Sequence, residues 1–245
     1  ISAHSGVDAR AGDFVIADVD LAMIHDTTGP IAIQAFEEYG KERVWDPSKM
    51  VVVLDHATPS PNERISNLHA LLRNFASAQG ITLFEVGDGV CHQLVVEKGL
   101  VSPGGLAVGA DSHTCTYGAL NVFAFGIGST DMSGVMLTGK LWLRVPGTMK
   151  VHIRGSMAEG TCAKDLMLHL IGKIGSDGAD YLALSFCGET VRGMSLSERM
   201  TLSNMAIECG AKAGLMEADD KTAAHLRALG KGEGIPAFDD DDARF

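Results

Sequence analysis

The chain has 245 residues, of which 46% are hydrophobic and 21% are charged, and its formal net charge is -11. This length is enough to bury one large or two moderate hydrophobic cores. The acidic balance argues against a nucleic-acid-binding protein, which needs a basic face. No apolar run reaches the length of a membrane span, and the first residues have no basic region and apolar core of a secretory signal. We therefore expect a cytoplasmic protein that binds neither nucleic acid nor membrane.

The cysteines are odd in number and scattered, and they include no Cys-x-x-Cys pair. This spacing predicts reduced thiols rather than a disulfide framework, a zinc site or an iron-sulfur site. We interpret Cys162, Cys187 and Cys209 as small buried hydrophobes. For Cys91 and Cys115 that interpretation is held more loosely, because both lie in polar segments. No metal ligand is assigned in this chain.

The first predicted unit is a strand at residues 14–23 followed by a short helix. Pro30 at the first helical position and Gly40 after the last turn mark the limits of the helix. His25 and Asp26 stand between strand and helix, so they are either a loop cap or the edge of a site. The cap is the preferred interpretation.

The second unit begins with residues 50–54, whose continuous β-branched sequence is typical of a strand buried on both faces. Asp55 and His56 follow it directly. A capping box at residues 60–63 then predicts a helix that ends at Gly80. The predicted inner stripe of this helix is Ile65, Leu68, Leu71, Leu72 and Phe75.

Two further strands, at residues 81–86 and 106–108, also lead into polar segments. The first leads to His92, which alone indicates no more than a histidine at the edge of an element. The second ends at Gly109 and is followed by Asp111, Ser112 and His113. Ligands bind beyond the carboxyl ends of parallel strands, so these side chains are candidates for a site. An Asx-turn with a capping serine explains the same residues about equally well.

The pattern restarts near residues 146–147, with a strand at 149–153, a helix capped by Thr161, a strand at 181–186 and a second capping box at 195–198. On the helix that this box opens, Asn204 and Glu208 are four residues apart and share a face, which is either a site or a solvated stripe. We predict domains at 1–146 and 147–229, then an acidic, glycine-rich linker at 230–245. The fold class is α/β, with layered α/β/α domains and mainly parallel sheets.

Several motifs carry a family resemblance: Asp-Thr-Thr-Gly-Pro at 26–30, Leu-Asp-His at 54–56, Gly-Asp-Gly-Val-Cys-His-Gln at 87–93, Gly-Ala-Asp-Ser-His-Thr-Cys-Thr at 109–116, Gly-Ile-Gly-Ser-Thr-Asp at 126–131, Thr-Gly-Lys at 138–140 and Ser-Asn-Met-Ala-Ile-Glu at 203–208. These motifs occur in the order typical of the aconitase superfamily. The chain resembles that superfamily, most closely its isopropylmalate dehydratase branch. Homoaconitase and 2,3-dimethylmalate dehydratase are the nearest alternatives. The resemblance implies aconitase-like domains and a hydro-lyase that removes and re-adds water on a 2-hydroxy di- or tricarboxylic acid.

The resemblance also implies roles for individual side chains. Asp55 and His56 would form the acid pair that helps the substrate hydroxyl leave. Asp111 and His113 would hold the iron-bound water or hydroxide. The remaining implied residues are the supporting pair His92 and Glu208, and Ser112, Asn204 and His25 on the substrate side, Asn204 also lying near the cluster. The physical logic agrees, because dehydration needs a proton donor, a base and a Lewis acid, and a carboxylate fixes the tautomer of a neighbouring imidazole.

The family binds a four-iron, four-sulfur cluster through a Ser-Cys-Thr-Asn turn and a Cys-x-x-Cys turn, and neither occurs in this chain. In isopropylmalate-type enzymes a separate small subunit carries a swivelling domain that supplies the catalytic base. The chain is therefore expected to be the first two domains of a longer large subunit, inactive alone, with the cluster, the small subunit and a hydroxy acid as partners. A cluster-free scaffold or binding module is the alternative from a different functional class.

Overall fold

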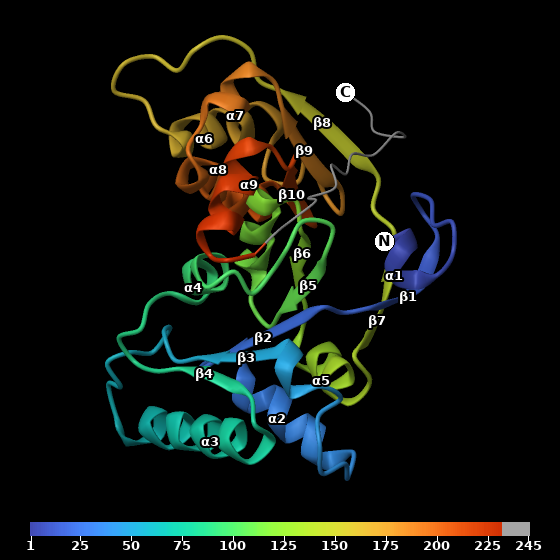
Figure 1. Cartoon of the computed structure of the whole chain (residues 1–245), viewed down its shortest axis with the longest axis vertical. Coiled ribbons are helices and arrows are strands. Elements are labelled where there is room, and N and C mark those ends of the chain that lie inside the picture. The colour runs from blue at the N-terminus through green and yellow to red at the C-terminus, as the bar shows by residue number, and fades with distance from the viewer. Residues whose placement is uncertain (232–245) are drawn as a thin grey trace.

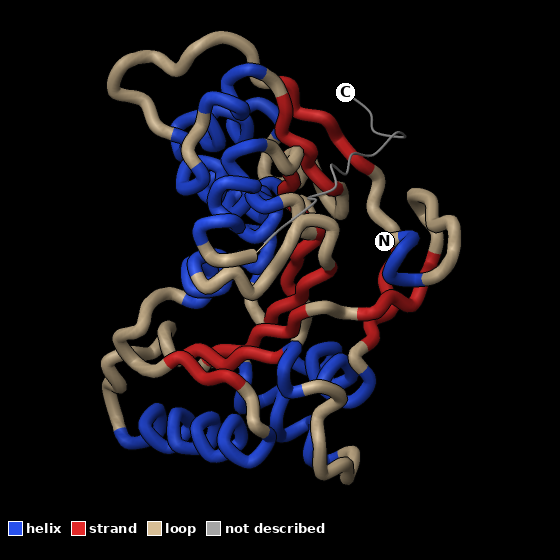
Figure 2. The backbone as a smooth tube through the Cα atoms, in the orientation of Figure 1, coloured by secondary structure: helices blue, strands red, loops and turns tan. Residues whose placement is uncertain are grey.

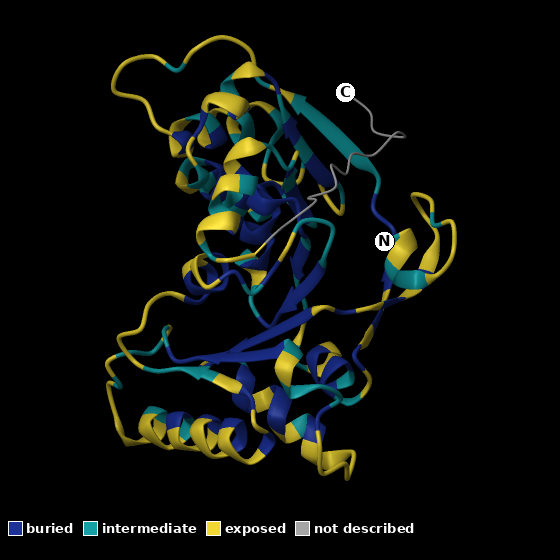
Figure 3. Cartoon of the chain, viewed as in Figure 1, coloured by how far each residue is buried: buried dark blue, intermediate teal, exposed yellow. Residues whose placement is uncertain are grey.

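A five-stranded parallel sheet forms the centre of the first part of the chain (Figure 1). The computed structural model describes residues 1–231. Across the sheet the strands are β4 (Thr82–Phe84), β3 (Met50–Val53), β2 (Leu21–His25), β5 (Leu106–Gly109) and β6 (Phe123–Gly126), and each neighbouring pair is parallel. Strands β2, β3 and β5 bury every residue, because both faces of the sheet are covered by other elements (Figure 3).

Helices cover this sheet on both faces. The helices α2 (Gly29–Glu38), α3 (Glu63–Gln79) and α5 (Ser129–Thr138) share one core cluster with Val52 and Val108 of the sheet, and Figure 2 shows them together on one side. On the other face, α4 (Cys91–Glu97) and the 3₁₀ segment η2 (Ser112–Leu120) pack against Met23 and Val53. The layered α/β/α architecture predicted from the sequence is confirmed.

A three-stranded parallel sheet forms the centre of the second part (Figure 1). Its order is β10 (Ala213–Met216), β9 (Ala183–Cys187) and β8 (Thr148–His152). Met167 of α6 (Ala163–Ile174) and Leu202 of α8 (Leu196–Asn204) pack against it. The smaller elements are α1 (Ser2–Ser5), η1 (Pro47–Lys49), α7 (Glu189–Gly193), η3 (Met205–Cys209) and α9 (Asp220–Ala228). Most of the predicted linker, residues 232–245, lies outside the described residues.

The prediction of a single strand over 14–23 is wrong. The structure has a separate β1 (Phe14–Asp18), which pairs with β7 (Lys140–Arg144) in an antiparallel ribbon before β2 begins. The break lies at Val19 and Asp20. The Val19 amide donates to the carbonyl of Gly139, whereas the Asp20 amide donates to the carbonyl of Leu106, so the chain changes partners between these two residues.

Helix starts differ from the prediction by one or two residues. Asn62, not Ser60, caps α3, and its side chain accepts a hydrogen bond from the amide of Ile65 at 3.1 Å. Cys162, not Thr161, caps α6, because the Thr161 hydroxyl donates instead to a preceding carbonyl. The capping box that opens α8 is present as predicted. No helix among residues 1–231 is long and apolar enough to cross a membrane.

The inner stripe of α3 is only partly as predicted. Leu72 and Phe75 are buried, whereas Leu71 is 39% exposed. His69 is buried in its place. His69 is held in the interior by a contact with the carboxylate of Asp26, described in the next section.

Candidate active site

The polar residues at the carboxyl ends of three neighbouring strands lie in contact. His25 ends β2, while His56 and Asp111 follow β3 and β5, the two neighbours of β2 in the sheet. The rings of His25 and His56 stack with centroids 3.8 Å apart. The Nε2 atom of His56 lies 3.2 Å from Oδ2 of Asp111. Parallel pairing therefore brings together residues that are far apart in the sequence, 31 positions for His25 and His56 and 55 for His56 and Asp111.

A glycine allows the turn after β5 to pack this closely. A Cβ atom added to Gly126 of β6 would lie 2.5 Å from the carbonyl oxygen of Asp111. Any side chain at this position would displace the turn that carries Asp111. Gly126 therefore allows the position of the carboxylate.

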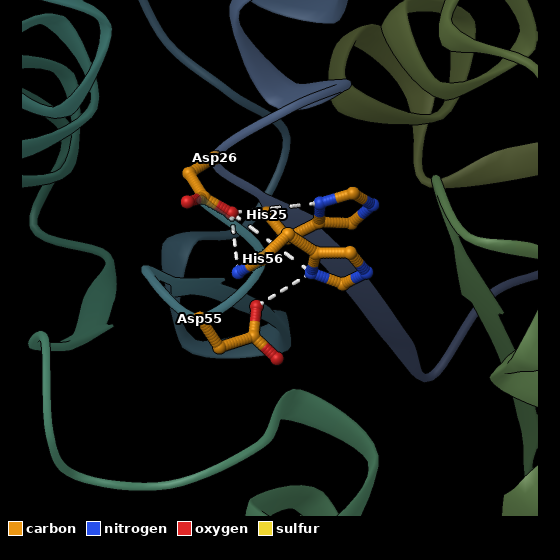
Figure 4. A group of neighbouring side chains, drawn as sticks. All are labelled: His25, Asp26, Asp55 and His56. Carbon is orange, nitrogen blue, oxygen red and sulfur yellow. Dashed lines mark hydrogen bonds and ion pairs between the residues drawn. The ribbon is translucent and has the colours of Figure 1, made fainter. Parts of the chain in front are cut away.

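Asp55 and His56 form a hydrogen-bonded pair, with Oδ1 of Asp55 2.8 Å from Nδ1 of His56 (Figure 4). The other carboxylate oxygen of Asp55 accepts the amide of Cys91 at 2.6 Å. Burial alone would raise the pKa of Asp55, but these hydrogen bonds lower it. Hydrogen bonds that the ring of His56 donates to the carboxylates of Asp111 and Asp55 raise the pKa of His56 to about 10. His56 therefore carries a proton at neutral pH.

Asp26 fixes the backbone of the turn that carries His56. It is fully buried, and its carboxylate accepts the amides of His56 at 3.0 Å and Ala57 at 2.7 Å. His69 of α3 lies 3.0 Å from the same carboxylate. Burial would raise the pKa of Asp26, but the hydrogen bonds from His25, these amides and His69 hold it well below its usual range. The group is a rigid support for His56.

Asp111 is the centre of the site. One carboxylate oxygen lies 2.7 Å from Nε2 of His92 and also accepts the amide of His113 at 2.7 Å, while the other faces His56. Burial opposes ionisation, but these contacts hold the pKa of Asp111 far below its usual range. Asp111 is also the N-cap of η2, so the Asx-turn and the site interpretations both apply to one carboxylate.

His92 is fixed from both ring nitrogens. Its Nδ1 atom lies 3.3 Å from the hydroxyl of Tyr117, which is fully buried. Burial raises the pKa of Tyr117 well above its usual value, so the phenol stays neutral and can donate to Nδ1. The Nε2–H of His92 then points to Asp111. Tyr117 was not identified from the sequence.

His113 and Glu208 form the exposed part of the site. Nε2 of His113 lies 3.2 Å from Oε1 of Glu208, and the two side chains are 37% and 52% exposed. The resemblance implied a pair between His92 and Glu208, whereas the structure pairs His92 with Asp111 and Glu208 with His113. The hydroxyl of Ser112 lies 3.2 Å from the other nitrogen of His113.

Asn204 reaches the site through η2. Its side-chain amide donates to the hydroxyl of Thr116 at 2.9 Å, and Thr116 in turn donates to the carbonyl of His113 at 2.7 Å. Asn204 ends α8 and Glu208 lies on the 3₁₀ segment η3, so the prediction that both share one continuous helix is wrong. Both side chains still contact residues of η2.

His25 lies beneath the ring of His56. It is 2% exposed, Nε2 is 3.1 Å from the carbonyl of Ala110, and Nδ1 is 3.0 Å from the hydroxyl of Thr27. Both ring nitrogens therefore have partners within the protein. The nine site candidates form one set linked by these contacts and by Thr116, with Asp111 at its centre.

Among the described residues, the one group of three or more potential metal ligands is His25, Asp26, Asp55 and His56, whose ligand atoms lie within 4.8 Å of one another (Figure 4). All four side chains take part in the hydrogen bonds described above, so we interpret the group as a hydrogen-bonding network. No cysteine belongs to it. Burial raises the pKa of Cys115 to about 12 and also raises those of Cys91 and Cys209, which favours thiols over thiolate ligands. These residues do not fit an iron-sulfur cluster.

The charge of His56 predicts a pH-dependent contribution to stability. Its folded pKa of about 10 exceeds the ordinary value of 6.5. The stabilisation is therefore fully present below 6.5 and is lost as pH rises toward 10. In urea unfolding, the loss of stability caused by His56→Gln should be largest near pH 6 and should shrink as pH rises toward 10. A loss that is constant with pH would contradict a charged His56.

Comparison with known proteins agrees with the fold and the motifs. Residues 2–242 match the aconitase family (aconitate hydratase). The chain is 54% identical to the 3-isopropylmalate dehydratase large subunit 1 of Methanopyrus kandleri, over 100% of this chain and 59% of that protein. It is 45% identical to a probable methanogen homoaconitase large subunit of Methanosarcina mazei, over 94% of this chain and 59% of that protein. The chain thus spans about three-fifths of the length of these curated relatives.

A solved structure shares the fold. The crystal structure of Thermococcus kodakaraensis aconitase X in its holo-form matches 82% of this chain and 52% of that chain, with a TM-score of 0.50. The sequence identity is 11%, so the likeness concerns the arrangement of the elements.

Proposed function

Since this chain belongs to the aconitase family, we propose that it is part of the large subunit of a dehydratase of the 3-isopropylmalate type. The reaction removes water from a 2-hydroxy di- or tricarboxylic acid and re-adds it at the neighbouring carbon. The observation that supports the proposal is the set of imidazoles with a ring nitrogen within 4.0 Å of the Asp111 carboxylate. They belong to His25 at the end of β2, His56 after β3, His92 of α4 and His113 of η2. The names of its relatives give the substrate class, with homoaconitase as the alternative.

His56 is the proton donor to the leaving hydroxyl in this proposal. Elimination breaks a C–O and a C–H bond and forms a carbon–carbon double bond, so the leaving oxygen needs a proton. The carboxylates of Asp55 and Asp111 keep His56 protonated, and 33% of its side chain is open to a ligand. When water adds back to the double bond, His56 recovers the proton. The base that takes the carbon-bound proton is assigned to the small subunit.

His113, Glu208 and Ser112 face the ligand at the rim of the site. The pair of His113 and Glu208 is the most exposed of the carboxylate–imidazole contacts here. Glu208 can hold the ring of His113 in one orientation and keep Nδ1 directed at Ser112, 3.2 Å away. We assign these groups to orienting the departing water and the substrate.

The family resemblance implies a four-iron, four-sulfur cluster that acts as a Lewis acid on the leaving hydroxyl. Because the cysteines of this chain do not fit such a group, we propose that the ligand thiolates come from the remainder of the longer enzyme. The proposed partners are accordingly that remainder and the small subunit with its swivelling domain.

Replacing Cys162 and Cys187 together with serine should leave cluster content unchanged. Cys162 is exposed and Cys187 is partly exposed, so the interpretation of these two as buried hydrophobes is wrong. The substitution therefore tests the accessible thiols without creating a cavity. The measurement is iron and sulfide per protein in the complete two-subunit enzyme after anaerobic reconstitution. Loss of iron from the double variant would assign a ligand to this chain and overturn the proposal.

The function is tested by turnover in the complete enzyme. The full-length large subunit, its small subunit and a reconstituted cluster are offered 2-isopropylmalate, homocitrate, 2,3-dimethylmalate and citrate. Formation of the unsaturated acid is followed by absorbance. We expect 2-isopropylmalate to give the highest kcat/KM. Highest kcat/KM with homocitrate would favour the homoaconitase alternative, and no turnover of any of these acids would refute a dehydratase.

A further inference from the structure

A second pocket shares a wall with the proposed active site. It has a volume of about 310 Å³ and lies between the carboxyl ends of β5 and β6 and the segment that leads into β10. Asp111 and Ser112 form its wall toward the site, and Asp180, Tyr181 and Lys212 line the rest together with glycine and apolar residues. A ligand held by Ser112 would therefore reach into this pocket.

Lys212 is the single cationic residue among those that line the pocket. Its backbone amide donates to the carbonyl of Leu182 at 2.7 Å, which fixes the start of the side chain just before β10. The ammonium lies 4.2 Å from the ring centroid of Phe125 and 5.6 Å from that of Tyr181. These rings stabilise the cation while leaving its N–H groups free for an acceptor.

The ammonium of Lys212 has no acceptor within the part of the chain that the structure describes. Across residues 1–231, no carboxylate lies within 4.0 Å of it and it donates no side-chain hydrogen bond. The side chain is half-buried, and burial lowers its pKa against the opposing effect of Asp131. A desolvated cation without an acceptor is costly, so a ligand that supplies one is favoured.

The acidic residues nearby do not cancel this cation. The charge of Asp111 is shared with His56, which is protonated, and with His92. Asp180 and Asp131 are exposed, and water screens their charges. Within residues 1–231, the pocket therefore presents one positive group that pairs with no carboxylate, beside the network centred on Asp111.

We propose that Lys212 binds a carboxylate of the substrate in this pocket, beside the network centred on Asp111. The inference rests on the proposed function, because the substrates of that reaction carry two or three carboxylates. One of them can lie against the pocket while the hydroxyl-bearing carbon remains near His56. An ammonium–carboxylate hydrogen bond in a partly desolvated pocket is stronger than a neutral one. Lys212 would then determine where the substrate sits, without transferring a proton.

Substitution of Lys212 in the complete enzyme should separate binding from chemistry. We expect Lys212→Met to raise KM roughly 30-fold, as for loss of a hydrogen bond to a charged group, while kcat changes less than about threefold. Lys212→Arg should recover most of the affinity because it keeps the positive charge. Lys164→Met, on the exposed side of α6, is the matched control and should leave KM unchanged. An unchanged KM in Lys212→Met would overturn the proposal.

Calorimetry with two small acids tests directly whether Lys212 binds a carboxylate, and it needs no turnover. Succinate and butyrate differ by one carboxylate, and we expect the wild-type enzyme to bind succinate at least tenfold more tightly. In Lys212→Met this ratio should fall to about twofold. A ratio that stays tenfold, with a lowered melting temperature, would mean that Lys212 packs against protein and would overturn the inference.

Should Lys212→Met fail to fold, Lys212→Gln gives the same comparison. If the wild type dehydrates no hydroxy acid but the ratio falls, the proposed function fails and the carboxylate site stands.

Discussion

Asp111→Asn should lower kcat of the complete enzyme by about 10²- to 10⁴-fold, the range associated with a lost acid–base group. Asparagine keeps the size of the side chain and can still accept the amide of His113, so the cap of η2 survives. What is lost is the negative charge that faces His56 and His92. Without it the pKa of His56 falls, and less of the proton donor is present at neutral pH.

This expectation is checked by steady-state turnover of 2-isopropylmalate together with a thermal unfolding midpoint. Asp177→Asn, on the exposed loop before β9, is the control for loss of one carboxylate and should keep wild-type kcat. A decline of less than tenfold in Asp111→Asn with an intact fold would remove Asp111 from the centre of the mechanism.

Much of the fold was predictable because buried parallel strands have a distinct sequence pattern. Residues 50–54 and 106–108 are continuous apolar runs. The first leads directly into polar side chains, and the second does so after Gly109 and Ala110. A parallel sheet places those side chains at one edge, which is why Asp55, His56 and Asp111 were identified together. Their roles in chemistry stay predictions, since the geometry gives contacts and charges rather than rates.

The residues that support the site were missed for a physical reason. His69 is a histidine on an amphipathic helix, and Tyr117 is an aromatic residue in a short 3₁₀ segment. Both patterns usually mean ordinary surface or core positions. Only their contacts with Asp26 and His92 distinguish them, and these contacts join residues 43 and 25 positions apart. Local sequence patterns carry no record of such pairs.

The division of strand 14–23 also depends on a distant contact. Val15 and Ala17 are buried and alternate with exposed neighbours, so β1 is a strand with one buried face. The chain then leaves β7 and joins β5, because the carboxylate of Asp20 accepts the amide of Leu106 at 3.0 Å. Asp18 and Asp20, in an otherwise apolar run, are the local signal of this change.

Asp219→Ala should destabilise the fold by about 3 kcal/mol, near the lower end of the range for breaking a buried ion pair. Arg199 is 1% exposed, and its two terminal nitrogens donate to the Asp219 carboxylate at 2.9 and 2.5 Å. Removing Asp219 leaves this guanidinium buried without its counter-charge. The carboxylate is 28% exposed, so water entering the space offsets part of the cost.

Asp220→Ala is the matched control, since Asp220 is the next residue on α9 and is exposed. It should cost less than about 1 kcal/mol, as expected for a surface carboxylate near a helix N-terminus. Urea unfolding near pH 7 compares the two variants. Burial opposes ionisation of Asp219, but its contacts with Arg199 lower its pKa, so its contribution is present above the unfolded pKa and is lost as pH falls through the folded one. The difference between the variants should therefore shrink in acid, and equal effects near pH 7 would show that the ion pair does not stabilise the junction of α8 and α9.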